Sequence, residues 1–378
     1  MRCCFFSPGH QSFRALAGES QIWGGAEAQV AHLAKVLAQF GHKVTLVYGD
    51  GERRTPPQLI GGVTCVDAAP TWRRPASLAA FWRALNFLCP DLIYARLPSD
   101  FLWMLGLFTR RHRASRFVYA LAHDLHCTPW DAYEYKPWFH APMYGLGLRT
   151  ADVITIQHEN QLTLLSPRLR SRVARVPNLV HSISASPRPY ADTTFDAIWV
   201  GQIRKEKQPE RFLELAAGLP DLCFAVAGEI AVGGELQTSL EARLLALKNL
   251  TYFGPQNHNR VMALIERSRV LVNTSAAEGF PNTMLEAWSV GVPVVSLSVD
   301  PGGIIERERL GLLSRTGAGL KHDVATLART ESLNLQFGSR GLAYVRRVHG
   351  LEAACEALTR ALPGAELVPV VARSARSR

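Results

Sequence analysis

The sequence predicts an α/β protein made of two Rossmann-like units in tandem, which face each other across a cleft. At 378 residues the chain is long enough for two or three domains, each able to bury a full core. Short apolar runs alternate with helical periodicity, as in a doubly wound parallel sheet. The alternation stops at 176–194, a stretch with three prolines and five Ser or Thr residues, and then restarts. We therefore expect a first unit over 1–178, a linker over 179–194, a second unit over 195–345, and a C-terminal helix with a basic tail over 346–378.

The first unit opens with a short buried strand and an amphipathic helix. Val30, Leu33 and Leu37 fall on one face of the predicted helix Gly25–Phe40. Further apolar runs predict more strands, with helix Ser77–Phe87 among them. The predicted strands are Arg2–Ser7, Val44–Tyr48, Gly62–Val66, Leu92–Tyr94, Phe117–Ala122 and Val153–Gln157.

The second unit repeats this alternation, and the stretch Gly338–Leu362 that follows it is predicted as one helix. Its predicted strands are Asp196–Val200, Phe224–Ala227, Leu250–Phe253, Val270–Thr274 and Pro293–Ser296. Its predicted helices are Pro209–Ala217, Leu236–Leu247, Asn259–Arg267 and Asn282–Val290.

Positive charge is concentrated in the first half of the chain. Residues 1–180 contain 20 Lys or Arg against 12 Asp or Glu, whereas 181–378 contain 22 against 20. A basic first half predicts an anionic partner: phosphates, nucleic acid or a membrane surface.

Cysteine usage and hydropathy predict the compartment. The seven cysteines form no C-x-x-C pair, so we expect buried thiols in a reducing environment. The longest suggestive apolar stretch, 101–108, is far shorter than the roughly 18 residues that span a bilayer. We expect a cytoplasmic protein, with peripheral attachment to the cytoplasmic membrane as an open alternative.

The strongest motif runs from Glu278 to Glu286 and follows a predicted strand. Pro281 suits the first position of the next helix, so the backbone N–H groups of Asn282 and Thr283 would form an anion site at its start. Glu278 and Glu286 could then bind sugar hydroxyls on either side of a diphosphate. The alternative is structural, because Thr283 with Glu286, or Ser275 with Glu278, fits a capping box.

Three further motifs follow predicted strands. Gly201 permits close backbone approach, and Arg204, Lys205 and Lys207 supply cations for a diphosphate; the alternative is a solvated basic loop. Gly24 and Gly25 head the first long helix, where amides could approach a phosphate or simply form a turn.

His123 follows the fifth strand, in the run Ala122 to Cys127. A zinc site is discounted because no partner pair shows suitable spacing, so no metal ligand is predicted. His123 is better interpreted as a substrate contact, with a histidine satisfied inside the fold as the alternative.

Together these segments resemble the family 4 glycosyltransferases of the GT-B fold, over roughly residues 2–360. The resemblance rests on GGAEAQVAHLAKVLAQFGHKVTLV, His123-Asp124, ADVITIQ (151–157), VPN (176–178), VGQIRKEKQPE (200–210), and E-x7-E with its tail EAWSVGVPVV (286–295). It implies two Rossmann-like domains, with the first on the acceptor side, and a C-terminal helix that crosses back.

The resemblance also implies roles for matching residues. The Gly25 backbone would approach the donor phosphate, His123 would contact the donor sugar, and Lys207 would neutralise the leaving diphosphate. Glu278 would bind sugar hydroxyls and Glu286 the nucleotide ribose. The backbone from Gly279 through Phe280 to Thr283 would offer N–H groups. The family commonly has Arg after the motif glycine where this chain has Gln202, so Arg204 or Lys205 would supply that cation, or Lys207 would act alone.

The expected activity is transfer of a sugar from a nucleotide-diphosphate sugar to a glycan or polyprenyl-diphosphate-linked acceptor, with retained anomeric configuration and no required metal or cofactor. Cell-envelope or exopolysaccharide synthesis is the expected setting. A sugar-nucleotide epimerase of the same fold remains open. An oxidoreductase with a nucleotide cofactor and two Rossmann units is disfavoured, because no G-x-G-x-x-G follows the first strand with an acidic residue about 20 positions later.

A binding protein without catalytic activity also remains open. Its basic aromatic segments would be Trp72-Arg73-Arg74, Phe81-Trp82-Arg83 and Phe101–Arg113. These could stack nucleic-acid bases or sit at a lipid headgroup layer. The lipid interpretation is preferred and nucleic acid is not expected, because no RNA- or DNA-binding motif accompanies them.

Overall fold

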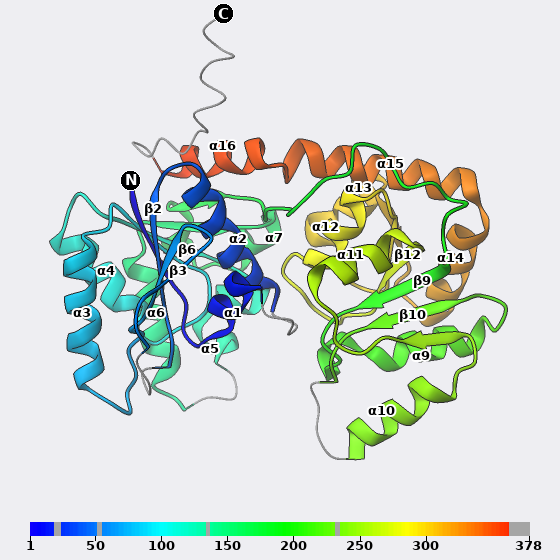
Figure 1. Cartoon of the computed structure of the whole chain (residues 1–378), viewed down its shortest axis with the longest axis horizontal. Helices are drawn as coiled ribbons and strands as arrows, with labels where there is room; N and C mark the ends of the chain where they lie inside the picture. The colour runs from blue at the N-terminus through cyan, green and yellow to red at the C-terminus, as the bar shows by residue number, and fades with distance from the viewer. Residues whose placement is uncertain (19–23, 51–54, 134–136, 231–234, 363–378) are drawn as a thin grey trace, which may run out of the picture. The chain divides into compact units, whose positions relative to one another are not determined.

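The computed structural model describes residues 1–18, 24–50, 55–133, 137–230 and 235–362. The chain divides into two compact units (Figure 1). The first comprises the N-terminal part through Leu179 together with the C-terminal segment from Leu351, and the second comprises Val180–Gly350. The basic tail predicted at the C-terminus lies outside the described residues. In the described residues, no helix has the length and hydropathy needed to cross a membrane.

The first unit contains an eight-stranded sheet in the order β3-β4-β2-β1-β5-β6-β7-β8, parallel except for β3. Its strands are β1 (Arg2–Phe6), β2 (Lys43–Tyr48), β3 (Gln58–Ile60), β4 (Val63–Asp67), β5 (Leu92–Ala95), β6 (Arg116–Ala120), β7 (Val153–Ile156) and β8 (Val173–Arg175). Its helices are α1 (Gln11–Ala17), α2 (Gly25–Gln39), α3 (Ala76–Leu88), α4 (Leu102–Arg111), η1 (Asp124–Cys127), α5 (Pro129–Ala132), α6 (His140–Thr150), α7 (Glu159–Leu164), α8 (Pro167–Arg170) and α16 (Leu351–Ala361).

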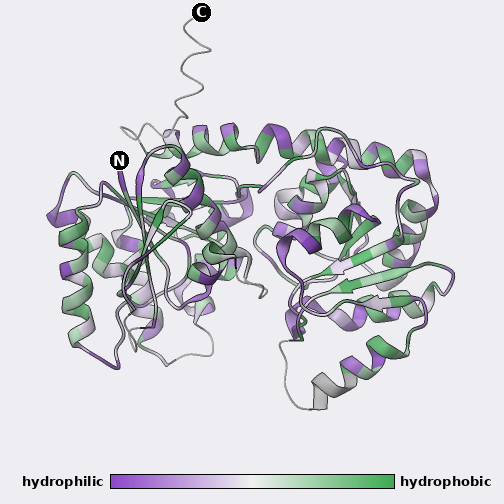
Figure 2. Ribbon diagram, in the orientation of Figure 1, coloured by the Kyte–Doolittle hydropathy of each residue, from purple (hydrophilic) through white to green (hydrophobic). Residues whose placement is uncertain are grey.

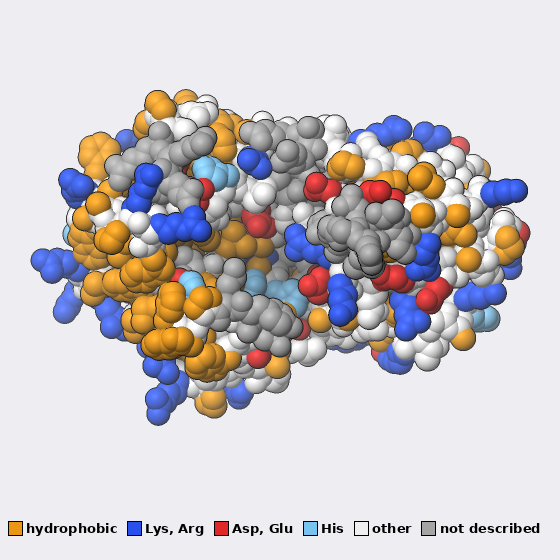
Figure 3. Space-filling model, turned by 90° about the horizontal axis from the view of Figure 1, so that it is seen from below, with side chains coloured by type: hydrophobic (Ala, Val, Ile, Leu, Met, Phe, Trp, Pro, Cys, Tyr) orange, Lys and Arg blue, Asp and Glu red, His pale blue; other side chains and the backbone are white. Residues whose placement is uncertain are grey.

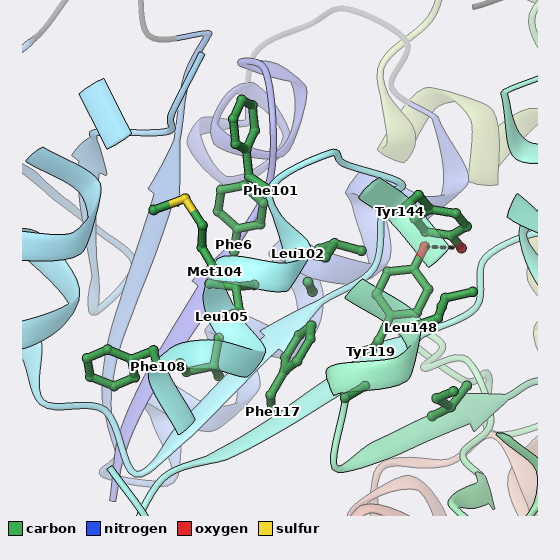
Figure 4. Packing of buried hydrophobic residues seen from close by; sticks show 14 of the residues in the cluster. Phe6, Phe101, Leu102, Met104, Leu105, Phe108, Phe117, Tyr119, Tyr144 and Leu148 are labelled. Atoms are coloured by element: carbon green, nitrogen blue, oxygen red, sulfur yellow. Dashed lines mark hydrogen bonds between the residues drawn. The ribbon is translucent and has the colours of Figure 1, made fainter. Parts of the chain in front are cut away.

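Both faces of this sheet are buried, because parallel strands carry helices on both sides. In β1, Cys4 and Phe6 face one cluster, and Cys3 and Phe5 face the other. Figure 4 shows the first cluster, in which α4 and α6 pack over the sheet and Tyr144 donates a hydrogen bond to Tyr119. The second cluster contains α2 residues and residues at and just after the end of α16, including Leu37, Leu358 and Leu362.

The second unit contains a six-stranded parallel sheet in the order β11-β10-β9-β12-β13-β14. Its strands are β9 (Phe195–Val200), β10 (Phe224–Ala227), β11 (Leu250–Tyr252), β12 (Ser268–Asn273), β13 (Val294–Ser296) and β14 (Gly311–Leu313). Its helices are η2 (Lys205–Lys207), α9 (Pro209–Gly218), α10 (Glu235–Ala246), α11 (His258–Glu266), α12 (Asn282–Ser289), η3 (Pro301–Gly303), α13 (Ile304–Glu308), α14 (Gly317–Arg329) and α15 (Glu331–Val348).

The middle residues of the central strands of both sheets are apolar, as expected for strands covered on both faces (Figure 2). In β9, Ala197 and Trp199 face one core cluster and Ile198 faces the other. The α/β class and the parallel sheets predicted from the sequence are therefore confirmed.

Two expectations are corrected. Gly338–Leu362 is not one helix: α15 ends at Val348, and α16 begins at Leu351. The His349 carbonyl accepts from Val180 N at 3.4 Å, and a Cβ at Gly350 would lie 2.7 Å from the Arg346 carbonyl oxygen, so the chain turns at this glycine. The cysteines are also not uniformly buried. All seven are free thiols, but Cys89 and Cys223 are exposed.

The chain passes from the first unit to the second between Leu179 and Val180. The following residues, predicted as linker, lie against the second unit. Ser184 N donates to Ser289 O at 2.9 Å, and Arg188 N donates to Val290 O at 3.2 Å.

Candidate functional site

The order in which strands are added to the sheet of the second unit reverses between β9 and β12. From β9 the chain adds β10 and β11 on one side and then β12, β13 and β14 on the other. In open α/β sheets, ligands bind outside the carboxyl ends of the strands at such a switch point. The loops that follow β9 and β12 carry the two strongest sequence motifs.

An ion pair joins these two loops. Lys207 Nζ forms a salt bridge with Glu278 Oε1, and Ser275 Oγ donates to the same oxygen at 2.8 Å. The Lys207 side chain remains 32% exposed, whereas Glu278 is only 12% exposed. The ammonium group is therefore held by a carboxylate and still reachable by a ligand.

Hydrogen bonds fix the backbone around Lys207. Trp199 Nε1 donates to Thr274 Oγ1 at 2.9 Å, and that hydroxyl donates to the Lys207 carbonyl oxygen at 2.6 Å. Gln208 follows with a φ of 46°, in the left-handed region that few residues other than glycine adopt. Such backbone strain tends to occur at functional sites, where the surrounding structure enforces it.

Helix α12 begins beside Glu278 without a side-chain cap. Pro281, predicted as the first helical residue, precedes the helix as its N-cap residue, and Asn282 is the first helical residue. No acidic residue lies in the first turn, so the capping-box alternative does not apply to this helix. The partial positive charge of the helix start thus lies next to the Lys207–Glu278 pair. Gly279 and Phe280 are buried in the connecting loop, and Thr283 is half-buried.

Glu286 lies in the second turn of α12, where burial raises its pKa from 4.5 to about 7. Its Oε1 lies 3.6 Å from His258 Nδ1 on α11, and burial lowers the pKa of this histidine. The His181 ring lies 5.3 Å from that of His258. A substantial fraction of Glu286 is therefore protonated near neutral pH before any ligand binds. His258 was not predicted from the sequence.

The backbone segments that follow β9 and β10 approach each other closely. A Cβ at Gly228 would lie 1.8 Å from the Gly201 carbonyl oxygen, so glycine is required at Gly228. Gly201 N donates to Ala227 O at 3.1 Å, and Ile203 N donates to Glu229 O at 2.7 Å. Gly228 was not predicted from the sequence, although a glycine directly after a strand was the signal that identified Gly201.

The remaining cations of this loop are placed differently from Lys207. Arg204 and Lys205 are exposed, and Gln202 is half-buried. Of the cations predicted here, Lys207 is the one paired with Glu278.

In the first unit, His123 follows β6 and is half-buried. It is the N-cap residue of η1, and its Nδ1 accepts from Leu125 N at 3.1 Å. Because Nδ1 is the acceptor, the proton of the neutral ring lies on Nε2, which can donate to a ligand. Burial, with a contribution from His123, lowers the pKa of nearby His126 to about 3.

A buried polar network occupies the same carboxyl edge of the first sheet. Asn178 Oδ1 accepts from Arg96 Nη2 at 2.7 Å and from Gln157 Nε2 at 3.0 Å. Arg96 is 5% exposed, which is unusual for a guanidinium group. Arg96 and Gln157 were not predicted. Each directly follows a strand, which is the signal that could have identified them.

Gly24 and Gly25 lie at the start of α2, with Gly24 as the N-cap residue. A Cβ at Gly24 would lie 2.2 Å from a carboxylate oxygen of Glu27, which is in the first turn. The acidic group thus lies against the helix start that was predicted to meet a phosphate. Gly24, Gly25 and His123 belong to the first unit, and all other predicted site residues belong to the second. Within the described ranges, no group of three or more His, Cys, Asp or Glu side chains is placed to hold a metal ion.

Comparison with known proteins agrees with this division into units. The family model described as glycosyl transferase 4-like domain matches residues 24–179, and the one described as glycosyl transferases group 1 matches residues 186–313. Among curated proteins, the alpha-galactosylglucosyldiacylglycerol synthase of Streptococcus pneumoniae is 27% identical over 146 residues. The match covers 35% of this chain and 39% of that relative, so the chain matches well under half of the relative's length.

Solved structures share the fold across nearly the whole chain. Sucrose-phosphate synthase from Thermosynechococcus elongatus has a TM-score of 0.73 at 16% identity, covering 99% of each chain. HepE from Anabaena, in complex with UDP-glucose, has a TM-score of 0.70 at 16% identity, covering 95% of this chain and 98% of that one. At these identities the likeness concerns the fold. With the two family models, it shows that the chain belongs to the family 4 glycosyltransferases of the GT-B fold.

Proposed function

We propose that this protein transfers a sugar from a nucleotide-diphosphate sugar to a glycan or lipid-linked acceptor, with retention of the anomeric configuration. The observation that carries the proposal is the Lys207–Glu278 pair at the switch point of the second sheet, beside the uncapped start of α12. A cation and a helix start form a suitable site for a diphosphate leaving group.

The second unit would hold the donor. Lys207 and the amides from Gly279 to Thr283 would bind the diphosphate, and Glu278 would bind sugar hydroxyls. Glu286 would accept hydrogen bonds from the ribose. Arg204 and Lys205 are exposed on the same loop and could add positive charge as the nucleotide arrives. The solved neighbour that contains UDP-glucose supports a nucleotide sugar as donor.

The first unit would complete the reacting centre. The Nε2–H of His123 is a donor on a half-buried imidazole, suited to hydrogen-bond the donor sugar close to the anomeric carbon. The backbone of Gly25 would approach the donor phosphate. The neighbouring Glu27 carboxylate would then have to swing away, or a water would have to lie between the two anions.

The chemistry needs stabilisation of charge on the leaving group more than a protein base. The bond from the anomeric carbon to the diphosphate oxygen breaks, and a bond to the acceptor hydroxyl forms on the same face of the ring. The hydroxyl proton passes to the departing diphosphate. Each preorganised donor aimed at the developing phosphate charge can lower the barrier by about 3 kcal/mol. No metal is needed for this step, because Lys207 and the helix start supply the positive charge.

The acceptor proposal rests on charge and on one relative. The first half of the chain is basic, and this excess is not needed by the donor site of the second unit. The S. pneumoniae relative is named for a glycolipid product. A lipid-linked acceptor, such as a polyprenyl-diphosphate-linked glycan in cell-envelope or exopolysaccharide synthesis, fits both observations.

The test begins with thermal melting of the full chain against a panel of UDP-, GDP- and ADP-sugars. A bound donor should raise the melting temperature, because it binds the folded state alone. The donor that does so is then incubated with lipid-linked and soluble glycan acceptors, and the anomeric configuration of the product is determined by NMR.

Each outcome has a definite meaning. A product with the donor's anomeric configuration supports the proposal, and an inverted product contradicts retention. A changed sugar without any acceptor would instead indicate an epimerase. Failure of every nucleotide sugar to stabilise the chain would contradict the donor site.

A further inference from the structure

His123 lies at the start of a short helix that needs support from its neighbours. Helix η1 is a 3₁₀-helix of four residues, and its hydrogen-bond geometry is poorer than that of an α-helix. His123 is half-buried, and Figure 3 shows that histidine side chains of the first unit reach the surface on one face. The contacts that fix η1 therefore decide where the imidazole of His123 points.

The first residue of η1 is anchored through its carboxylate. Gln161 Nε2 donates to Asp124 Oδ1 at 3.0 Å, and His158 Nε2 lies 3.1 Å from the same oxygen. Gln161 is 0% exposed and His158 3%, whereas the Asp124 side chain is 31% exposed. Two buried polar side chains at the start of α7 thus hold one partly exposed carboxylate.

The amide of Gln161 is itself fixed in orientation. Its Oε1 accepts from Gln157 N at 2.8 Å, directly after β7, so Nε2 is the end that faces Asp124. The Gln157 side chain continues these contacts, because its Nε2 donates to Asn178 Oδ1 at 3.0 Å. The carboxylate of Asp124 is therefore connected by hydrogen bonds to the backbone at the end of β7.

A second contact holds the other end of η1. The Tyr144 hydroxyl lies 2.7 Å from the His126 carbonyl oxygen, and Tyr144 is fully buried. His126 N in turn donates to the His123 carbonyl oxygen at 3.0 Å. The element that presents His123 is thus held at both ends, by α6 and by α7.

We propose that Gln161 and Asp124 are positioning residues, which hold the imidazole of His123 in the orientation that its reaction requires, with His158 packed against the same carboxylate. This inference rests on the role proposed above for His123. Gln161 acts through Asp124, and Asp124 acts through the main chain that joins it to His123. A group that is oriented before the ligand binds needs no reorganisation as charge develops. Loss of these contacts should therefore slow the chemical step rather than weaken donor binding.

The central test is a double-mutant cycle on kcat with Gln161→Met and His123→Ala. Methionine has nearly the volume of glutamine but no amide, so Gln161→Met removes the hydrogen bonds to Asp124 and Gln157. It should lower kcat about tenfold or more and leave the KM for the nucleotide sugar unchanged. In the His123→Ala background it should have no further effect, because Gln161 acts through His123.

The matched control for stability is Ser115→Ala. Ser115 is 6% exposed, and its Oγ donates to Pro90 O at 2.6 Å. It directly precedes β6, whereas His123 follows that strand, so the two lie toward opposite ends of β6. Ser115→Ala should lower the melting temperature and leave kcat unchanged, which separates lost stability from lost orientation.

Two variants of Asp124 distinguish positioning from direct contact with the substrate. Asp124→Asn keeps an oxygen that can accept from Gln161, and Asp124→Leu keeps none. A positioning role predicts a kcat within about threefold of the unaltered chain for Asp124→Asn and a loss like that of Gln161→Met for Asp124→Leu. A carboxylate that contacts the substrate would instead make the two variants equally slow.

A second readout does not depend on catalysis. Nitrogen NMR of isotope-labelled imidazole rings reports the tautomer, and the signals of His123 are identified by their loss in His123→Ala. Because Nδ1 accepts from Leu125 N, the unaltered chain should show the proton on Nε2. Gln161→Met should shift or broaden these signals, and Ser115→Ala should leave them unchanged.

Three results would overturn the inference. They are a further loss of kcat when Gln161→Met is added to His123→Ala, equal losses in Asp124→Asn and Asp124→Leu, and unchanged ring signals of His123 in Gln161→Met. Full kcat in His123→Ala alone would refute the role proposed for His123 itself. The ring signals would still decide separately whether Gln161 and Asp124 orient this imidazole.

Discussion

Lys207 is held in position by its neighbours. Its backbone is held through Thr274 and Trp199, and its ammonium group through Glu278. An exposed lysine would spend most of its time in solvent, whereas this one is already oriented before a ligand binds. Preorganisation of this kind makes a charge effective in a transition state, because no reorganisation is needed when charge develops.

Replacing Lys207 by Ala should therefore reduce kcat by roughly 100- to 1,000-fold while leaving the melting temperature nearly unchanged. Lys248→Ala is the matched control, since it removes an exposed lysine of the second unit that lies outside the motif loops. Steady-state kinetics of both variants with the identified donor measure the effect. Equal kinetics for the two variants would contradict a special role for Lys207.

Glu286 is a candidate donor-binding residue, and its burial disfavours the charged form of its carboxyl group. Burial raises its pKa to about 7, while the unfolded chain would release this proton near pH 4.5. The folded state therefore holds a proton that the unfolded state loses between these pH values. The stability contributed by this group is complete below pH 4.5 and is lost as the pH rises through 7.

Glu286→Gln should remove this pH dependence. The free energy of unfolding of the variant, relative to the unaltered chain, should rise between pH 4.5 and 7.5 by up to about 3 kcal/mol. Urea unfolding at a series of pH values, followed by a probe in the second unit, measures this difference. The exposed Glu214→Gln serves as control, and a flat difference for Glu286→Gln would show that its pKa is ordinary.

At the scale of elements, the donor side is built from loops that follow adjacent parallel strands. Parallel pairing brings the ends of β10, β9 and β12 to one edge, so Gly228, Gly201 and Thr274 lie at neighbouring strand ends. The close approach of Gly228 to the Gly201 carbonyl sets how the motif loop leaves its strand. Neither residue has a side chain that could contact a ligand, and both act through the backbone.

Gly228→Ala should displace the loop that carries Lys207 and destabilise the second unit by about 2 kcal/mol or more, since the added Cβ would overlap backbone. Gly317→Ala is the matched control, because nothing lies within 4 Å of a Cβ at Gly317. Thermal melting and donor affinity are measured for both. Melting of Gly228→Ala at the temperature of the unaltered chain would contradict the close contact.

At the scale of the whole molecule, the first strand and the last described helix belong to one unit. Helix α16 comes last in the described sequence, yet Leu358 belongs to the core of the first unit with Phe5 and Leu37. Residues that follow the whole second unit in the sequence therefore complete the hydrophobic core of the first unit. A piece of chain that ended at Gly350 would leave that core face uncovered.

Leu358→Ala should destabilise the first unit by about 2–5 kcal/mol, because it removes a side chain that is 2% exposed. Leu351→Ala, at a 41% exposed position of the same helix, should cost far less. Hydrogen exchange read segment by segment measures the effect. Protection should fall in β1 and β2 but not in β9 or β12, and equal loss in both units would contradict the assignment of α16 to the first core.

The strands were predicted closely because both faces of a parallel sheet are buried and each strand becomes a continuous apolar run. Phe224–Ala227 matches β10 in full, and α2 differs from its prediction by one residue. Short edge strands such as β8 were missed, since three residues of which none is buried give no such signal. The break at Gly350 was also missed, because it depends on a contact with Val180, which is far away in sequence.

The sequence by itself determined the fold class, the two similar α/β units and the residue types that the motif loops carry, because these depend on local periodicity and on residue type. Only the tertiary structure decided which of the candidate site residues contact one another. It paired Lys207 with Glu278, left Arg204 and Lys205 exposed, and laid Glu27 against the helix start of Gly24. Contacts between residues far apart in sequence depend on how elements pack, which no local pattern encodes.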